Sequence, residues 1–86
     1  MDPAFVYLLR CADGSLYCGW TTDVERRVAA HASGRGGRYT ASRRPVELAR
    51  SWALPTRGQA RSAEARIKRL SRAEKLALLE GAPLPR

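Results

Sequence analysis

The chain has 86 residues, 44% of them hydrophobic, which is enough for one small domain with a modest core. Sixteen Lys and Arg residues against eight Asp and Glu residues give a net charge of +8. Such basicity predicts an anionic partner, first of all a nucleic acid, against the simpler alternative of a basic protein without one. Two cysteines and one histidine are too few for a disulfide framework or a zinc site, and neither a signal peptide nor a membrane-spanning stretch is visible. We therefore expect a cytoplasmic protein that does not enter a membrane.

Two strands come first in the chain. Residues 4–10 (AFVYLLR) and 15–20 (SLYCGW) are rich in residues that favour strands, and the Asp-Gly pair at 13–14 between them is a turn signal. The two-residue period of a strand places Tyr17 and Gly19 on one face of the second strand. A glycine inside a strand is typical of a position that another group approaches closely. We therefore expect a β-hairpin with such an approach at Gly19.

A helix is predicted next, over about residues 23–33. Thr22 followed by Glu25 fits a capping box, and Gly34 is a good terminator. Helical spacing defines an inward face of four residues, and two of the four, an arginine and a histidine, carry a guanidinium and an imidazole. The residues on this predicted face are Val24, Arg27, Val28 and His31.

A region without periodicity follows, over residues 34–45. Its sequence, GRGGRYTASRRP, predicts a loop. Glycines beside arginines let a backbone follow phosphates closely, although a solvated loop is the simpler interpretation. Residues 46–54 then alternate as a third strand, which Pro55 ends. The residues that this alternation places on one side are Val46, Leu48, Trp52 and Leu54.

Two helices close the sequence. The spacing predicts the first over residues 57–70. Ser71 and Glu74 form a capping box that starts the second, and Gly81 ends it.

The complete order of elements is ββαβαα. We expect one domain over residues 1–86, with a core over about 4–80 and a frayed tail over 81–86. A small three-stranded sheet flanked by helices accommodates this order, so the predicted fold class is α+β.

Glu64 interrupts the apolar stripe of the helix over 57–70. On a 3.6-residue period it shares a face with Ala60 and Ile67. A carboxylate on an inward face is costly unless a partner or a metal compensates its charge. Two interpretations follow: a structural ion pair between Glu64 and the inward Arg27, or a functional site that contains both.

Several residues stand at a spacing that resembles the GIY-YIG nuclease superfamily. The resemblance runs from residue 4 to about 80 and points to the small, stand-alone, single-domain branch. One departure is that this chain contains no asparagine, whereas many relatives place one after the glutamate helix. The matching elements are FVY at residues 5–7, YCG at residues 17–19 with the motif glycine Gly19, Arg27, His31 and Glu64.

The resemblance implies a catalytic role for each matching side chain. Tyr7 would be the general base, with Tyr17 holding Tyr7 or the attacking water by a hydrogen bond, or with the two roles exchanged. Arg27 would grip the scissile phosphate, and His31 would orient the substrate or assist proton transfer near the leaving group. Glu64 would hold a single divalent metal ion, Mg²⁺ or Mn²⁺, which would neutralise the carboxylate inside the apolar stripe.

The resemblance implies a metal-dependent endonuclease that hydrolyses phosphodiester bonds in DNA. We expect it to respond to DNA structure rather than sequence, in repair or processing, because its binding would be mostly to phosphates. The residues expected to contact nucleic acid are Arg35, Arg38, Tyr39, Arg43, Arg44 and Lys68. A non-catalytic nucleic-acid-binding module on the same scaffold is the alternative, which the missing asparagine supports. A basic adaptor for a protein partner is a third and weaker interpretation.

Overall fold

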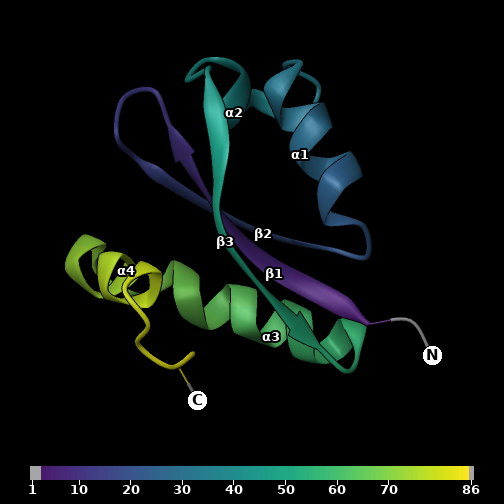
Figure 1. Cartoon of the computed structure of the whole chain (residues 1–86), viewed down its shortest axis with the longest axis vertical. Coiled ribbons are helices and arrows are strands. Elements are labelled where there is room, and N and C mark those ends of the chain that lie inside the picture. The colour runs from purple at the N-terminus through teal and green to yellow at the C-terminus, as the bar shows by residue number, and fades with distance from the viewer. Residues whose placement is uncertain (1–2, 86) are drawn as a thin grey trace.

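The structure, a computed structural model, describes residues 3–85. Its elements follow the predicted order with one short helix added after α1 (Figure 1). None of these helices, over the described residues, is long and apolar enough to cross a membrane. The strands are β1 (Ala4–Cys11), β2 (Leu16–Thr21) and β3 (Val46–Leu54), and the helices are α1 (Val24–Ala32), α2 (Arg38–Ala41), α3 (Arg57–Lys68) and α4 (Arg72–Leu79).

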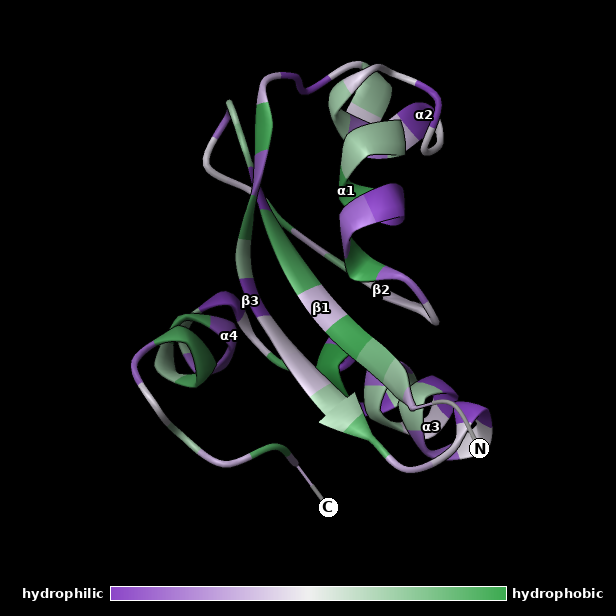
Figure 2. Cartoon of the chain, turned by 45° about the vertical axis from the view of Figure 1, so that its right-hand side comes forward, coloured by the Kyte–Doolittle hydropathy of each residue, from purple (hydrophilic) through white to green (hydrophobic). Residues whose placement is uncertain are grey.

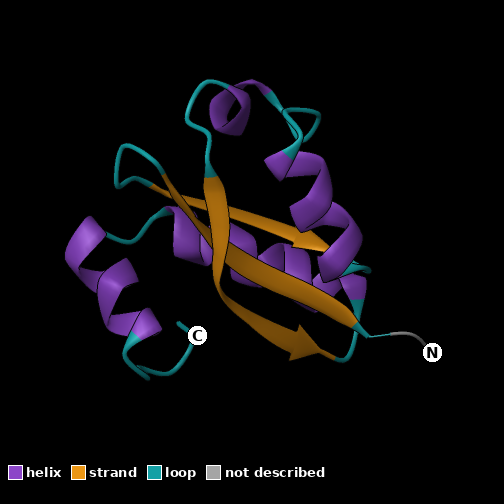
Figure 3. Cartoon of the chain, turned by 45° about the horizontal axis from the view of Figure 1, so that its top comes forward, coloured by secondary structure: helices purple, strands orange, loops and turns teal. Residues whose placement is uncertain are grey.

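The three strands form one antiparallel sheet in the order β2-β1-β3, with β1 in the centre. β1 and β2 form the predicted hairpin, in which Tyr7 lies opposite Gly19. Figure 3 shows the sheet between helices that lie on both of its sides. The predicted α+β fold with three strands is therefore confirmed.

A β-bulge divides β3 into two parts. Leu8 of β1 pairs with Arg50, whereas Leu9 pairs with Leu48, so Ala49 is an extra residue in β3. One extra residue turns every later side chain to the other face of the sheet. Val46, before the bulge, therefore faces α1, whereas Trp52 and Leu54, after it, face α3. The prediction of one shared side is wrong for the set Val46, Leu48, Trp52 and Leu54.

Different helices cover the two faces of the sheet, as Figure 1 shows. Because side chains alternate along β1, this central strand contributes to both faces, and Figure 2 shows that it is largely hydrophobic. The face covered by α1 buries Tyr7, Leu9, Cys11 and Val46. The face covered by α3 and α4 has a wholly apolar buried cluster, made by Val6, Leu8, Leu16, Cys18, Ala63, Ile67 and Leu78.

The helix ends follow their capping signals with one correction. Asp23 rather than the predicted Thr22 caps α1, because the Asp23 carboxylate accepts the backbone N–H three residues further on. Gly34 has a φ of +86°, the left-handed conformation that suits the residue after a helix. The capping box of α4 is confirmed, since Ser71 and Glu74 each accept a backbone N–H from the other.

The segment predicted as a loop contains the four-residue helix α2. It begins after Gly37, whose φ is +132°. Thr40 in this helix is fully buried. Four residues are too few to show a helical period, so local sequence carries no sign of α2.

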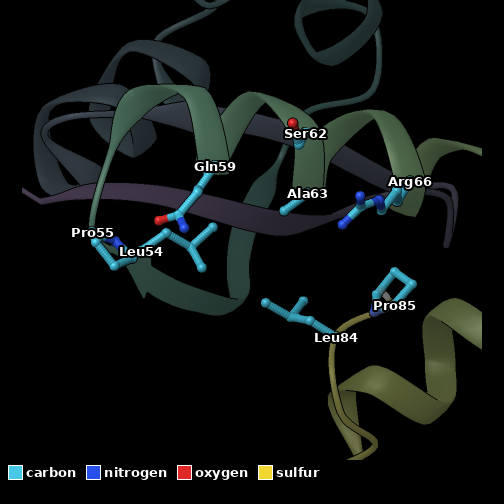
Figure 4. A pocket seen from close by; sticks show the side chains of 8 residues that line it. All are labelled: Leu54, Pro55, Gln59, Ser62, Ala63, Arg66, Leu84 and Pro85. Atoms are coloured by element: carbon cyan, nitrogen blue, oxygen red, sulfur yellow. The ribbon is translucent and has the colours of Figure 1, made fainter.

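The end of the chain lies against the domain. Ala82 and Leu84 pack on the apolar cluster under α3 and α4. Figure 4 shows Leu84 near Ala63 of α3, across a groove that both residues line. Residues 82–85 thus differ from the expected frayed tail because Leu84 has a core contact to make, while the last residue of the chain lies outside the described part.

Candidate active site

Tyr7 lies on the central strand, on the face covered by α1, and is only 2% exposed. Gly19 is its partner on β2, and a Cβ at this glycine would collide with the Tyr7 phenol. The close approach predicted at Gly19 is therefore made by the ring of Tyr7, which lies across the β2 backbone.

A buried chain of hydrogen bonds links Tyr7 to both α1 and α2. The Tyr7 hydroxyl lies 3.0 Å from Nε2 of His31, and Nδ1 of the same ring lies 2.7 Å from Oγ1 of Thr40. His31 and Thr40 have no exposed surface. Sequence reasoning missed Thr40, because a threonine in an apparent loop gives no signal of burial. The three side chains form a polar core on this face of the sheet.

His31 occupies a different position from the one expected. Both of its ring nitrogens are engaged by protein groups, and a Cβ at Gly36 would collide with the ring, so the backbone before α2 closes over it. Burial, and then the Arg27 guanidinium, lowers the pKa of His31 below its ordinary value of 6.5, so the ring is neutral at pH 7. His31 is therefore enclosed by protein groups and hydrogen-bonded to the Tyr7 hydroxyl, where it can position the phenol.

Tyr17 extends this cluster toward the surface. Its ring centroid lies 6.5 Å from that of Tyr7 and 5.1 Å from that of His31. Tyr39 of α2 packs on Tyr17 at 5.7 Å, and the Arg43 guanidinium lies 3.8 Å from the centre of the Tyr39 ring. Tyr17 is thus held between the buried imidazole and α2.

Arg27 and Glu64 act on the Tyr7 hydroxyl from two different helices. Burial, and then Tyr17, raises the pKa of Tyr7 above its ordinary value of 10.0; Arg27 acts in the opposite direction, and Glu64 raises it further. The charges of Arg27 and Glu64 thus influence the Tyr7 phenol in opposite directions. The alternative of a structural ion pair between Arg27 and Glu64 is not realised, because Oε1 of Glu64 pairs with Nζ of Lys68 at 3.6 Å.

The arginines of the segment over residues 34–45 differ in how freely they can bind a ligand. Arg43 is tied to the hairpin turn by an ion pair of 3.0 Å with Asp13, and it also donates to the backbone of α2. Arg35 donates an Nε hydrogen bond to the Ser33 hydroxyl at the end of α1, and Arg44 donates one to the Ala41 carbonyl. Arg38 is exposed on α2. Of the residues predicted to contact nucleic acid, Arg43 and Lys68 are held in ion pairs, with Asp13 and Glu64 respectively.

Two grooves open at opposite ends of β2, on either side of the tyrosines. The groove beside α1 has a volume of about 410 Å³ and is lined by Thr21, Thr22, Asp23, Arg26, Arg27 and Ala30. The groove beside α4 has a volume of about 190 Å³ and is lined by Ser15, Leu16, Tyr39, Arg72 and Lys75. No role for Arg26, Arg72 or Lys75 was predicted from the sequence, and only the tertiary structure places Arg72 and Lys75 of α4 next to the start of β2.

Comparison with known proteins gives the family. Residues 3–77 match the family described as the GIY-YIG catalytic domain. The UPF0213 protein BH0048 of Halalkalibacterium halodurans is 48% identical over 92% of this chain and 86% of its own length. A UPF0213 protein of Nitratidesulfovibrio vulgaris is 55% identical over 87% of this chain and 68% of its own length.

Two solution NMR structures share the fold. The structure of the UPF0213 protein BH0048 from Bacillus halodurans has a TM-score of 0.56 at 47% identity, covering 94% of this chain and 88% of that one. The structure of the protein EF2693 from E. faecalis has a TM-score of 0.63 at 43% identity, covering 93% and 85% of the two chains.

The fold, the residues around Tyr7 and these matches define a domain of a nuclease class. The chain belongs to the GIY-YIG catalytic domain family, as its sequence motifs predicted. Nucleic acid is the class of substrate that this membership implies. The names of the related proteins state neither an activity nor a substrate.

Proposed function

We propose that this chain is a divalent-metal-dependent endonuclease that hydrolyses phosphodiester bonds in DNA. The observation that carries the proposal is the buried Tyr7 hydroxyl, which is hydrogen-bonded to His31 and whose pKa the charges of Arg27 on α1 and Glu64 on α3 both influence. A packing core requires neither charge beside a phenol. Hydrolysis of a phosphodiester requires a proton acceptor, a cation for the phosphate and help for the leaving oxygen.

Glu64 is the residue that would hold Mg²⁺ or Mn²⁺. Within residues 3–85, no cluster of three or more His, Cys, Asp or Glu side chains could hold a metal without help. The Glu64 side chain is 23% exposed, so its carboxylate reaches solvent. Mg²⁺ is ordinarily bound by one or two carboxylates together with water and substrate phosphates, and this single carboxylate fits that pattern. When bound, the ion would supply positive charge at the phosphate and at the departing oxygen.

Tyr7 would accept the proton of the attacking water. An ordinary phenol with a pKa near 10 is about three units above neutrality, which costs roughly 4 kcal/mol. Burial raises the pKa of Tyr7 further, so other groups must favour the phenolate. The Arg27 guanidinium and the hydrogen bond with His31 are the groups of this chain that can do so. Tyr17, half-buried beside Tyr7, would hold the water, and the reverse assignment of the two tyrosines is tested below.

Arg27 would bind the non-bridging oxygens of the scissile phosphate. A guanidinium presents two parallel N–H donors that match two phosphate oxygens, which a lysine cannot reproduce. Arg27 is exposed and lines the groove beside α1, where Arg26 is also found. The scissile phosphate and the next phosphate along the DNA strand would thus each have an arginine of its own.

The bound DNA strand would run along β2, between the groove beside α1 and the groove beside α4. β2 is an edge strand of six residues, and so spans roughly 17 Å. Arg26 and Arg27 stand at one end, and Arg72 and Lys75 at the other. Contacts to phosphates do not distinguish one base sequence from another. They therefore support recognition of DNA shape, as in repair or processing. This arrangement therefore supports a nuclease that recognises DNA structure rather than DNA sequence.

The test is a cleavage assay on single-stranded, duplex, flap and branched DNA with Mg²⁺ or Mn²⁺. We expect Glu64→Gln and Arg27→Ala to lower the rate by about 10²–10³-fold, the loss typical of one electrostatic contact to the transition state. Tyr7→Phe should lower it by about 10²–10⁴-fold if Tyr7 is the base, and Tyr17→Phe should then have the smaller effect. The reverse order would exchange the two roles.

The matched control for these variants is Arg66→Ala, which removes a cation from the groove of Figure 4 on the side of β3. Circular dichroism of each variant shows whether the fold is kept. Equal cleavage by the parent, Glu64→Gln and Arg27→Ala would contradict the proposed site. Binding of DNA without cleavage of any substrate would instead support the non-catalytic module, which the absence of asparagine favours.

A further inference from the structure

The buried chain Thr40–His31–Tyr7 can carry its protons in two ways while the imidazole is neutral. In the first, Nδ1–H donates to the Thr40 oxygen, and Nε2 accepts the Tyr7 hydroxyl proton. In the second, the Thr40 hydroxyl donates to Nδ1, and Nε2–H donates to the Tyr7 oxygen. The two arrangements differ in consequence, because a donor aimed at the phenol oxygen favours the phenolate, whereas an acceptor favours the neutral phenol.

The surroundings of Thr40 distinguish the two arrangements. Thr40 has no exposed surface, so bulk water does not satisfy its hydroxyl. Over residues 3–85, Nδ1 of His31, at 2.7 Å, is the one hydrogen-bond partner of Thr40 Oγ1. A buried hydroxyl proton needs an acceptor, and an unprotonated Nδ1 supplies it. The Tyr7 hydroxyl is buried as well, but it belongs to the proposed site, where the attacking water or a phosphate oxygen can take its proton.

We propose that Thr40 is a positioning residue that fixes His31 as the Nε2–H tautomer, so that His31 donates a hydrogen bond to the Tyr7 oxygen. The assignment rests on the proposed function, which supplies the acceptor of the Tyr7 proton, while the tautomer itself can be measured on the folded chain alone. His31 keeps its proton throughout, and it holds the Tyr7 oxygen with a donor when the phenol proton has left.

The short helix α2 is suited to this role, because adjacent residues in it hold the two rings of the site. Tyr39 packs on Tyr17 at 5.7 Å, and Thr40 binds His31. The backbone at Gly36 lies so close to the imidazole that no larger residue fits there. α2 therefore acts as a clamp that orients both tyrosines, one by packing and one through the imidazole.

The first test is a measurement of the His31 tautomer. The protein contains one histidine, so a long-range ¹H–¹⁵N correlation spectrum of the ring has a single unambiguous assignment. At neutral pH we expect Nε2 to resonate as a protonated nitrogen and Nδ1 as an unprotonated one that accepts a hydrogen bond. A protonated Nδ1 in the parent protein would overturn the proposal without reference to any activity.

The second test compares Thr40→Val, which keeps the shape but loses the hydroxyl, with Thr40→Ser, which keeps the hydroxyl. We expect Thr40→Val to lose the single Nε2–H tautomer and to lower kcat by about tenfold or more, the range seen when a partner that orients a histidine is removed. KM should stay unchanged, because Thr40 does not reach the substrate. Thr40→Ser should restore both the tautomer and the rate.

The control is Ser62→Ala on α3, which removes an exposed helix hydroxyl on the other side of the sheet. An unchanged tautomer and rate in Thr40→Val would overturn the role of Thr40. If Thr40→Val does not fold, the spectra of the parent and of Thr40→Ser still decide the tautomer. If the parent cleaves nothing, the proposed function fails, whereas the tautomer measurement remains valid and separate.

Discussion

The two faces of the sheet are built from alternate residues of the same strand, and they differ in what they bury. Under α3 and α4, β1 contributes Val6 and Leu8 to a cluster of apolar side chains. Under α1 and α2, it contributes Tyr7, which meets His31 and Thr40 in a buried chain of hydrogen bonds. The first face requires only shape and hydrophobicity, whereas the second requires each polar atom to have its partner.

This difference teaches how a domain of 86 residues can accommodate both a core and a site. Apolar burial on one face supplies stability that does not depend on direction. The other face can then hold groups whose geometry matters more than their contribution to stability. We expect substitutions on the two faces to affect different quantities: stability on the face of α3, and activity or pH dependence on the face of α1.

The largest expected effect on stability is that of Ile67→Ala, because Ile67 is fully buried in the apolar cluster. Such a truncation leaves a cavity and should lower the free energy of unfolding by about 2–5 kcal/mol. Arg27→Ala, an exposed position on α1, should change it by less than about 0.5 kcal/mol. Urea denaturation followed by circular dichroism measures both. Similar losses in the two variants would show that the faces are not separated in this way.

A smaller effect is expected from pH, through His31. Its pKa is lowered in the folded protein, so between that value and 6.5 the unfolded chain binds more protons than the folded one. The contribution of His31 to the free energy of unfolding should therefore be constant above pH 6.5 and should fall as the pH is lowered from 6.5 toward the folded pKa. Stability measured from pH 7.5 to 5 by denaturation, values chosen around the ordinary histidine pKa of about 6.5, tests this.

His31→Gln is the control for the pH measurement, since glutamine does not titrate. Its stability should change much less over the same interval. The carboxyl groups with lowered pKa, Asp13 and Glu74, start from ordinary values of 3.8 and 4.5 and so act at lower pH. An equally steep loss in His31→Gln would assign the pH dependence to groups other than the buried imidazole.

The smallest expected effect is that of Lys75→Gln on DNA binding, measured by fluorescence anisotropy in EDTA with Glu64→Gln as the background. Loss of one phosphate contact should weaken binding uniformly and reduce the slope of log K against log salt by about one. Arg66→Gln makes the same change of charge in the groove of Figure 4, on the side of β3, and should leave the slope nearly unchanged. Equal changes in both variants would show that binding follows net charge rather than a path along β2.

Several parts of the site could be predicted from the sequence because their signals are local. Gly19 in a strand indicated a close approach, which the Tyr7 ring makes. Glu64 on an apolar stripe indicated either an ion pair with Arg27 or a site, and the structure shows its carboxylate 23% exposed and paired with Lys68. The expectation that His31 orients the substrate or assists proton transfer rested on motif spacing, which gives no measure of depth; the structure buries it completely.

The amino-acid sequence by itself determined the hairpin, the third strand, three of the helices, the capping box of α4 and the family. The reason is that alternation, helical spacing and caps depend on residues that are close together in the sequence. Only the tertiary structure decided the bulge in β3, the helix α2, the packing of Leu84 and the burial of His31 against Thr40. Each of these features depends on contacts with a distant segment of the chain. The contacts that stabilise it therefore form only once the chain has folded.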